Sequence, residues 1–143
     1  MQLDSCRRIQ LDVMHRFFCE DFVKCEALFQ VTYESIYSRF TLHAISEKQE
    51  EELLKNVKTA LKKGGRLYIE ARTTKDDLYG KGKQVGKNTF IYNDHFRRFI
   101  DVEELKEKLL KLGFIIISLD EDKGFSRTAD SDPVLLRLVV ESK

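Results

Sequence analysis

The stretch that decides the fold is Leu61-Lys62-Lys63-Gly64-Gly65-Arg66-Leu67-Tyr68-Ile69-Glu70-Ala71-Arg72. Apolar residues lead into it at helical spacing, namely Leu53, Leu54, Val57, Ala60 and Leu61. Gly64 comes next and suits the left-handed residue that ends many helices. Residues Arg66–Thr73 are then predicted to form a buried strand. A helix that turns directly into an apolar strand is typical of an α/β domain.

The rest of the chain continues this alternation of strands and helices. Ser46 with Gln49, and Asp101 with Glu104, have the spacing of capping boxes, so helices should begin after Ser46 and after Asp101. Gly113 should end the second of these helices. The apolar face of that helix is assigned to Leu105, Leu109, Leu110 and Leu112. Further elements are expected as strands at Arg16–Cys19, Tyr33–Phe40, Phe114–Leu119 and Val134–Glu141, and as a helix at Val23–Gln30.

The connection between the last two strands sets their direction. It contains the only proline, Pro133, and leaves no room for a crossover helix, so the two strands should be antiparallel. We therefore predict an α/β fold with one mostly parallel sheet and an antiparallel final strand. Its strands are Tyr33–Phe40, Arg66–Thr73, Phe114–Leu119 and Val134–Glu141.

Composition narrows the class of protein. The length of 143 residues, with 42% hydrophobic and 34% charged residues, indicates one globular domain. The net charge of +1 gives no global field that would favour nucleic acid or a membrane surface. Cys6, Cys19 and Cys25 lack the paired spacing of a zinc site, so we expect reduced thiols and no metal. With no signal peptide or long apolar run, a cytoplasmic location is expected.

Residues Thr74–Phe99 show no long periodic pattern and are predicted to form a long functional loop. The stretch from Lys62 to Arg98 contains ten lysines and arginines and four aspartates and glutamates. Guanidinium forks match phosphate and carboxylate oxygens, so we expect this region to bind an anionic substrate. The candidate substrate-binding residues are Arg72, Lys75, Tyr79, Lys81, His95, Arg97 and Arg98. The alternative is that Arg97 or Arg98 pairs with Asp94 or Asp101 at the surface.

Several motifs carry a family resemblance. They are Tyr33-Glu34-Ser35-Ile36-Tyr37-Ser38-Arg39-Phe40-Thr41-Leu42-His43-Ala44-Ile45, the Leu-Lys-x-Gly-Gly turn at 61–65, the run D-x-x-Y-G-K-G at Asp76–Gly82 and the run H-x-R-R-F-I at His95–Ile100. Together with the final antiparallel pair of strands, they resemble the second half of a class I S-adenosylmethionine-dependent methyltransferase. The resemblance extends from Arg16 to the C-terminus and implies a truncated Rossmann-like sheet, with residues 1–143 as a single partial domain.

The resemblance implies S-adenosylmethionine as cofactor and assigns it residues. Asp4, in Leu3-Asp4-Ser5-Cys6, resembles the acidic residue that binds the hydroxyl groups of the cofactor ribose. Asp21 resembles the residue that meets the adenine amino group, although it would also suit a helix N-cap. Ser38, Arg39 and Phe40 lie at the end of a strand where the cofactor would bind. His43, just beyond, is a candidate general base, with a purely structural hydrogen-bonding role as the alternative.

The family's glycine-rich cofactor loop has no counterpart, because all seven glycines lie at Gly64 or later. The chain alone is therefore expected to bind S-adenosylmethionine weakly or not at all, and to be inactive. Whether it is a fragment, a damaged gene product or a pseudoenzyme stays open. The resemblance implies that the intact form methylates a small anionic acceptor.

A non-enzymatic alternative is an α/β module that binds a partner or associates with itself. The strand Tyr33–Phe40 would lack the central strand that pairs with it in the family. It is apolar and aromatic, and its only charged residues, Glu34 and Arg39, give little protection against pairing with another chain, so a homodimer is predicted. Residues Met1–Gln30 could cover this edge instead. A nucleic-acid binder is the least supported class, because no basic-aromatic motif accompanies the neutral net charge.

Overall fold

A computed structural model describes residues 10–11, 16–17 and 32–143. Its main sheet has the strand order β3-β4-β9-β8, with the bounds Tyr33–Arg39, Leu61–Arg72, Leu135–Ser142 and Phe114–Asp122 in that order. β3 and β4 are parallel, whereas β9 is antiparallel to both of its neighbours. Three strands thus share one direction and the final strand opposes them, which confirms the predicted sheet.

The helix α2, Glu47–Ala60, begins as predicted. Ser46 Oγ accepts a hydrogen bond from the Gln49 N–H, and the Ser46 N–H donates one to Gln49 Oε1, so the capping box is complete. The predicted end at Gly64 is wrong, because Leu61 already has an extended backbone and pairs with Tyr33. Gly64 has a left-handed φ of 82° but lies inside β4, beside a shift in the β3–β4 register.

The helix α3, Val102–Lys111, has Asp101 as its N-cap, whose Oδ1 accepts from the Glu104 N–H at 3.1 Å. Only this half of the predicted capping box is present, since the Glu104 carboxylate accepts from Lys87 Nζ at 2.6 Å. Leu105 and Leu109 are buried, but Leu110 is 53% exposed, so its assignment to the apolar face is wrong. Leu110 follows Leu109 by about 100° around the helix, which turns it toward solvent.

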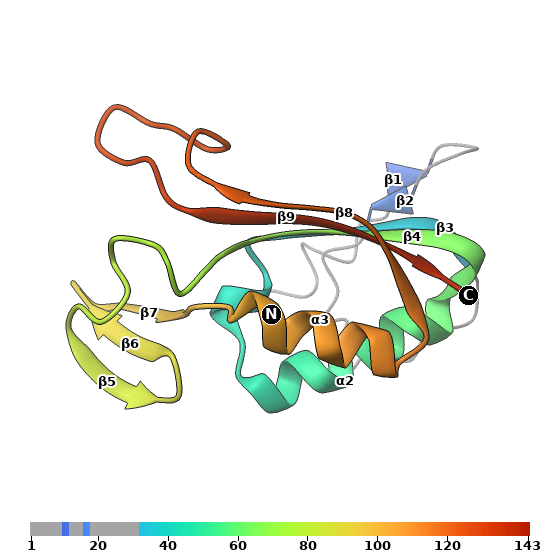
Figure 1. The fold of residues 1–143 in the computed structure, drawn as a ribbon, viewed down its shortest axis with the longest axis horizontal. Coiled ribbons are helices and arrows are strands. Elements are labelled where there is room, and N and C mark those ends of the chain that lie inside the picture. Colours follow the sequence, from blue (N-terminus) through green and yellow to red (C-terminus); the bar gives the residue numbers. More distant parts are fainter. Residues whose placement is uncertain (1–9, 12–15, 18–31) are drawn as a thin grey trace.

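Both helices lie on the same face of the sheet (Figure 1). Alternate residues of β4 point into the core on this face, including Leu67, Ile69 and Ala71. On the other face Tyr37 is 72% exposed and stacks on Tyr68 with ring centroids 4.6 Å apart. The core of the described residues is therefore built between one sheet face and two helices.

The segment predicted as a loop, Thr74–Phe99, contains a three-stranded antiparallel sheet instead. Its strands are β5, Lys83–Gly86, β6, Thr89–Tyr92, and β7, His95–Arg98. Asn88, Asn93 and Asp94 have positive φ angles between 52° and 61°, and they form the tight turns that join these strands. The small sheet lies beyond the ends of β3 and β4 (Figure 1), so it can cover a site there.

At the N-terminal side, β1, Gln10–Leu11, pairs antiparallel with β2, Arg16–Phe17, in a separate two-stranded sheet. The expected strand Arg16–Cys19 is described only at its first two residues, and these do not join the main sheet. The expected helix Val23–Gln30, Asp4, Asp21 and the three cysteines lie outside the described residues. Within the described part of the chain, no helix combines the length and apolarity needed to cross a membrane.

Candidate functional site

A cavity of about 230 Å³ lies where β3 and β4 end and β7 approaches them. Its walls are formed by Phe40, His43, Arg72, His95, Phe96 and Arg97. All of these except Phe96 were predicted as site residues from the sequence. In an open α/β sheet, ligands bind outside the carboxyl ends of the strands, and this cavity occupies that position.

The corner after β3 places an aromatic ring against a histidine. Phe40 has a φ of 58°, and its N–H donates to the Glu70 carbonyl at 2.7 Å. Its ring lies 5.6 Å from the ring of His43, which belongs to the short 3-10 turn η2, Leu42–Ala44. A left-handed residue followed by a tight turn therefore brings His43 back toward the ends of the strands.

Arg72, the last residue of β4, is held by a carboxylate four residues further along the chain. Its Nη1 lies 3.0 Å from Oδ2 of Asp76, whose side chain is only 2% exposed. Asp76 Oδ1 also accepts from the Val134 N–H at 2.8 Å, just before β9 begins. This ion pair ties Arg72 to two parts of the backbone and holds it at the edge of the cavity.

Arg97 brings a second guanidinium to the cavity. Among the described residues, no carboxylate lies within ion-pair distance of it. Burial lowers the pKa of Arg97, and the nearby positive charge of Arg72 lowers it further. Two guanidinium groups thus face one cavity, and within the described part of the chain Arg72 is paired with a carboxylate whereas Arg97 is not.

His43 adds a neutral imidazole to this group. Its Nδ1 atom is buried and finds no hydrogen-bond partner among the described residues. Burial lowers the pKa of His43, and the charges of Arg72 and Arg97 lower it further. The cavity therefore combines positive charge with a base that is unprotonated at neutral pH, an arrangement suited to an anionic ligand.

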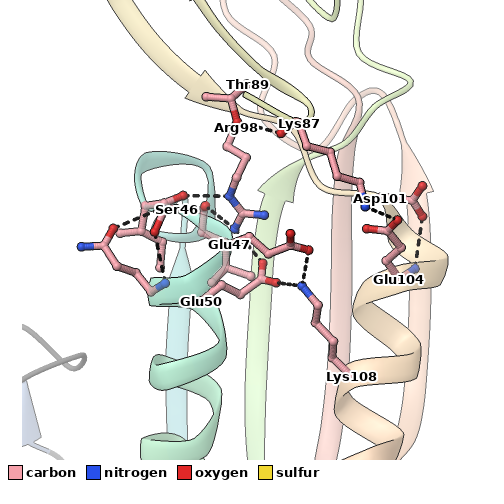
Figure 2. Close-up of polar contacts among 12 residues, drawn as sticks. Ser46, Glu47, Glu50, Lys87, Thr89, Arg98, Asp101, Glu104 and Lys108 are labelled. Atoms are coloured by element: carbon pink, nitrogen blue, oxygen red, sulfur yellow. Dashed lines mark hydrogen bonds and ion pairs between the residues drawn. The ribbon is translucent and has the colours of Figure 1, made fainter. Parts of the chain in front are cut away.

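Arg98, also predicted to bind substrate, does not line the cavity. Its Nη2 donates to Glu50 Oε1 at 2.7 Å, and the two side chains are 9% and 2% exposed (Figure 2). The surface pairing with Asp94 or Asp101 that the sequence left open is not what the structure shows for either arginine. Glu50 carried no sequence signal as a partner beyond its place on the α2 pattern.

Three more predicted substrate residues lie outside the cavity walls. Lys75 Nζ is 3.3 Å from Glu121 Oε1. The Tyr79 hydroxyl donates to Asn88 Oδ1 at 2.7 Å, and its ring packs edge-on against Phe90 and Phe99. Lys81 is exposed to solvent.

By contrast, Phe96 lines the cavity and was not predicted as a site residue, although it lies inside the His95–Ile100 run that the sequence singled out.

Solved structures that resemble this chain are S-adenosylmethionine-dependent methyltransferases. One from Methanosarcina mazei has a TM-score of 0.71 and 14% identity, over 86% of this chain and 65% of that protein. One from Mesorhizobium loti has a TM-score of 0.60 and 15% identity, over 85% and 67%. The 1,6-didemethyltoxoflavin-N1-methyltransferase of Burkholderia thailandensis, solved with 1,6-didemethyltoxoflavin and S-adenosylhomocysteine, has a TM-score of 0.55 and 14% identity, over 79% and 45%. No family model and no curated protein matches the sequence.

The chain therefore has the class I S-adenosylmethionine-dependent methyltransferase fold. It spans 65% of the length of the Methanosarcina mazei protein. The antiparallel position of β9 between β4 and β8 agrees with the final pair of strands on which the sequence resemblance rested.

The described residues make only part of a cofactor site. Ser38, near the end of β3, is buried, its Oγ has no partner among the described residues, and it does not line the cavity. Arg39 Nε donates a hydrogen bond to Glu70 Oε1 at 2.9 Å, and the Arg39 guanidinium lies 4.9 Å from the Phe40 ring centroid. Asp4 and Asp21 lie outside the described residues, and no glycine precedes Gly64. These residues do not complete a site for S-adenosylmethionine.

Proposed function

We propose that this chain is part of an S-adenosylmethionine-dependent methyltransferase that, in its intact form, methylates a small anionic acceptor. The observation that carries the proposal is the cavity in which His43, Arg72 and Arg97 meet at the ends of β3 and β4. The shared fold supports the reaction class. The charge of the cavity supports the acceptor class.

The two arginines supply the anion contact. Guanidinium groups bind carboxylate and phosphate oxygens through paired, charge-assisted hydrogen bonds. Arg72 is already oriented by Asp76, whereas Arg97 has no carboxylate partner among the described residues. A volume of about 230 Å³ is smaller than the roughly 300–1,000 Å³ of sites for drug-sized ligands, which favours a small acceptor.

His43 supplies a base beside the anion contact. A lowered pKa leaves its imidazole neutral at physiological pH, so it can accept a proton from an acceptor O–H or N–H group. Because Nδ1 is buried and has no accessible surface, we expect a ligand in the cavity to meet the imidazole at its other ring nitrogen.

Paired ligands that differ only in charge test the anion contact. We would titrate the chain with benzoate and with benzamide and follow the His43 ring signals by NMR. Benzoate should shift them saturably and benzamide should not. Arg97→Gln should weaken benzoate binding by roughly tenfold, the value of a charge-assisted contact. The matched control is Lys81→Gln, an exposed lysine outside the cavity, which should bind like the parent chain.

An equal response to benzoate and benzamide would contradict an anionic acceptor. The reaction itself is tested in the intact protein, by transfer of a labelled methyl group from S-adenosylmethionine to small carboxylates and phosphates. The non-enzymatic alternative rests on the edge of β3, which pairs with β4 alone among the described residues.

A further inference from the structure

Arg98 holds the turn that carries His43 at both of its ends. Its Nη2 donates to the Leu42 carbonyl at 3.0 Å and its Nε to the Ile45 carbonyl at 2.7 Å. The turn η2 lies between these two carbonyls. A turn of three residues has little stability of its own, so its position depends on such contacts from outside.

A buried carboxylate of α2, itself paired with a lysine of α3, holds the Arg98 guanidinium in place. Glu50 of α2 accepts from Arg98 on Oε1 at 2.7 Å and from Lys108 of α3 on Oε2 at 2.8 Å. Lys108 also lies 2.8 Å from Glu47 Oε2 (Figure 2). Because Arg98 and Glu50 are almost fully buried, removing the Glu50 charge would leave the guanidinium without a carboxylate partner in the interior. The guanidinium is therefore not free to move away from η2.

The strand β7 links this network to the cavity. Arg97 and Arg98 are consecutive, and they pair with Phe90 and Thr89 of β6. Successive side chains of a strand point to opposite faces, so Arg97 reaches the cavity while Arg98 reaches η2. The Arg72 guanidinium is placed by a different contact, the ion pair between its Nη1 and Asp76 Oδ2 at 3.0 Å. The Arg98 network therefore acts on His43 and Arg97 rather than on Arg72.

We propose that Arg98 is a positioning residue, which sets the distance between the His43 imidazole and the Arg97 guanidinium. Only the use of the cavity rests on the proposed function, because the contacts of Arg98 stand whatever ligand binds. Lysine cannot replace Arg98 here. Its single ammonium group lacks the planar fork that reaches two carbonyls and a carboxylate at once.

The test measures how strongly Arg97 and His43 interact in the folded chain. Among the described residues, the charged and titratable groups that line the cavity with His43 are Arg72 from β4, and His95 and Arg97 from β7. Arg97→Gln should raise the pKa of His43, measured by NMR titration, because it removes a nearby positive charge. In an Arg98→Lys background the same substitution should raise that pKa by roughly half as much or less, as expected when one residue mediates the coupling of two others.

A control separates positioning from loss of stability. Val57→Ala removes buried methyl groups at the other end of α2 and destabilises the fold, but it should leave the Arg97–His43 coupling intact. If Arg98→Lys does not fold, Glu50→Gln provides the same comparison with the guanidinium left unpaired. An undiminished coupling in the Arg98 or Glu50 variant would overturn the proposal. If the coupling falls in the Arg98 or Glu50 variant but the parent chain does not bind benzoate, the proposal stands and the proposed function is rejected instead.

Discussion

Arg72 and Asp76 form an ion pair at the end of β4, with Nη1 3.0 Å from Oδ2. The same carboxylate accepts from the backbone N–H groups of Leu78 and Val134. One buried side chain therefore orients a cavity arginine and joins the segment after β4 to the start of β9.

Asp76→Asn should destabilise the fold and loosen Arg72. The amide has one acceptor oxygen where the carboxylate has two, so a buried N–H or the guanidinium loses its partner, at a cost of about 2 kcal/mol. Urea denaturation measures this loss. The matched control is Asp77→Asn, because Asp77 is 74% exposed in its pair with Lys123, and its free energy of unfolding should change by less than about 0.5 kcal/mol. Equal losses for the two variants would contradict the role given to Asp76.

The pKa of His43 predicts a pH dependence of stability. In the folded chain this pKa lies below the ordinary value of 6.5. As the pH falls below 6.5, the unfolded chain takes up the proton first, so stability is lost as the pH falls through the folded pKa. His43→Gln should reduce the loss between about pH 7.5 and pH 5, measured by urea denaturation at each pH. His95→Gln, a change at an exposed position of β7, should keep it. A loss of the same size in all three proteins would refute the prediction.

Gly82 should be far less tolerant of substitution than Gly80. Both have positive φ angles, 85° and 86°, so either alanine adopts a strained backbone at about 1–2 kcal/mol. A Cβ on Gly82 would also overlap the carbonyl of Ile91, whereas nothing lies within 4 Å of one on Gly80. Gly82→Ala should therefore be the more destabilising of the two by thermal unfolding. Equal melting temperatures for Gly82→Ala and Gly80→Ala would show that the backbone of β6 shifts at Ile91 without measurable cost.

S-adenosylmethionine should bind this chain weakly or not at all. No glycine precedes Gly64 to supply the turn that places backbone N–H groups against the cofactor. Isothermal titration calorimetry of the isolated chain should give no saturable heat, with S-adenosylhomocysteine as a second ligand. A dissociation constant in the low micromolar range would mean that another segment replaces the loop.

The free edge of β3 should promote self-association. Among the described residues β3 pairs with β4 alone. A lysine on an edge strand opposes pairing with a second sheet, so Tyr37→Lys should weaken a dimer seen by sedimentation equilibrium. Ile117→Lys changes the opposite edge strand, β8, and should leave the dimer unchanged. A monomer at all concentrations would rule out the dimer, and strong hydrogen-exchange protection of β3 in that monomer would indicate that the chain covers its own edge.

Local patterns predicted the main sheet and the helix starts well. The strands Tyr33–Phe40 and Arg66–Thr73 were found because apolar side chains recur along them, and Ser46 marked its helix because a hydroxyl satisfies free N–H groups at a helix start. The small sheet β5–β7 was missed. Its strands have four residues each and are mostly exposed, so they lack a strong apolar alternation. The turn residues Asn88, Asn93 and Asp94 were its only signal.

By itself the sequence determined the α/β class, the antiparallel final strand and most residues of the cavity, because burial patterns and short connections act over a few neighbouring residues. Only the tertiary structure decided which of two consecutive arginines faces the cavity. Arg97 and Arg98 are the same residue type, and the pleat of β7 separates them. Arg98 is the one that turns inward, because it meets Glu50, which lies 48 positions away in the chain. A buried guanidinium is stable only where the fold brings a buried carboxylate into contact with it.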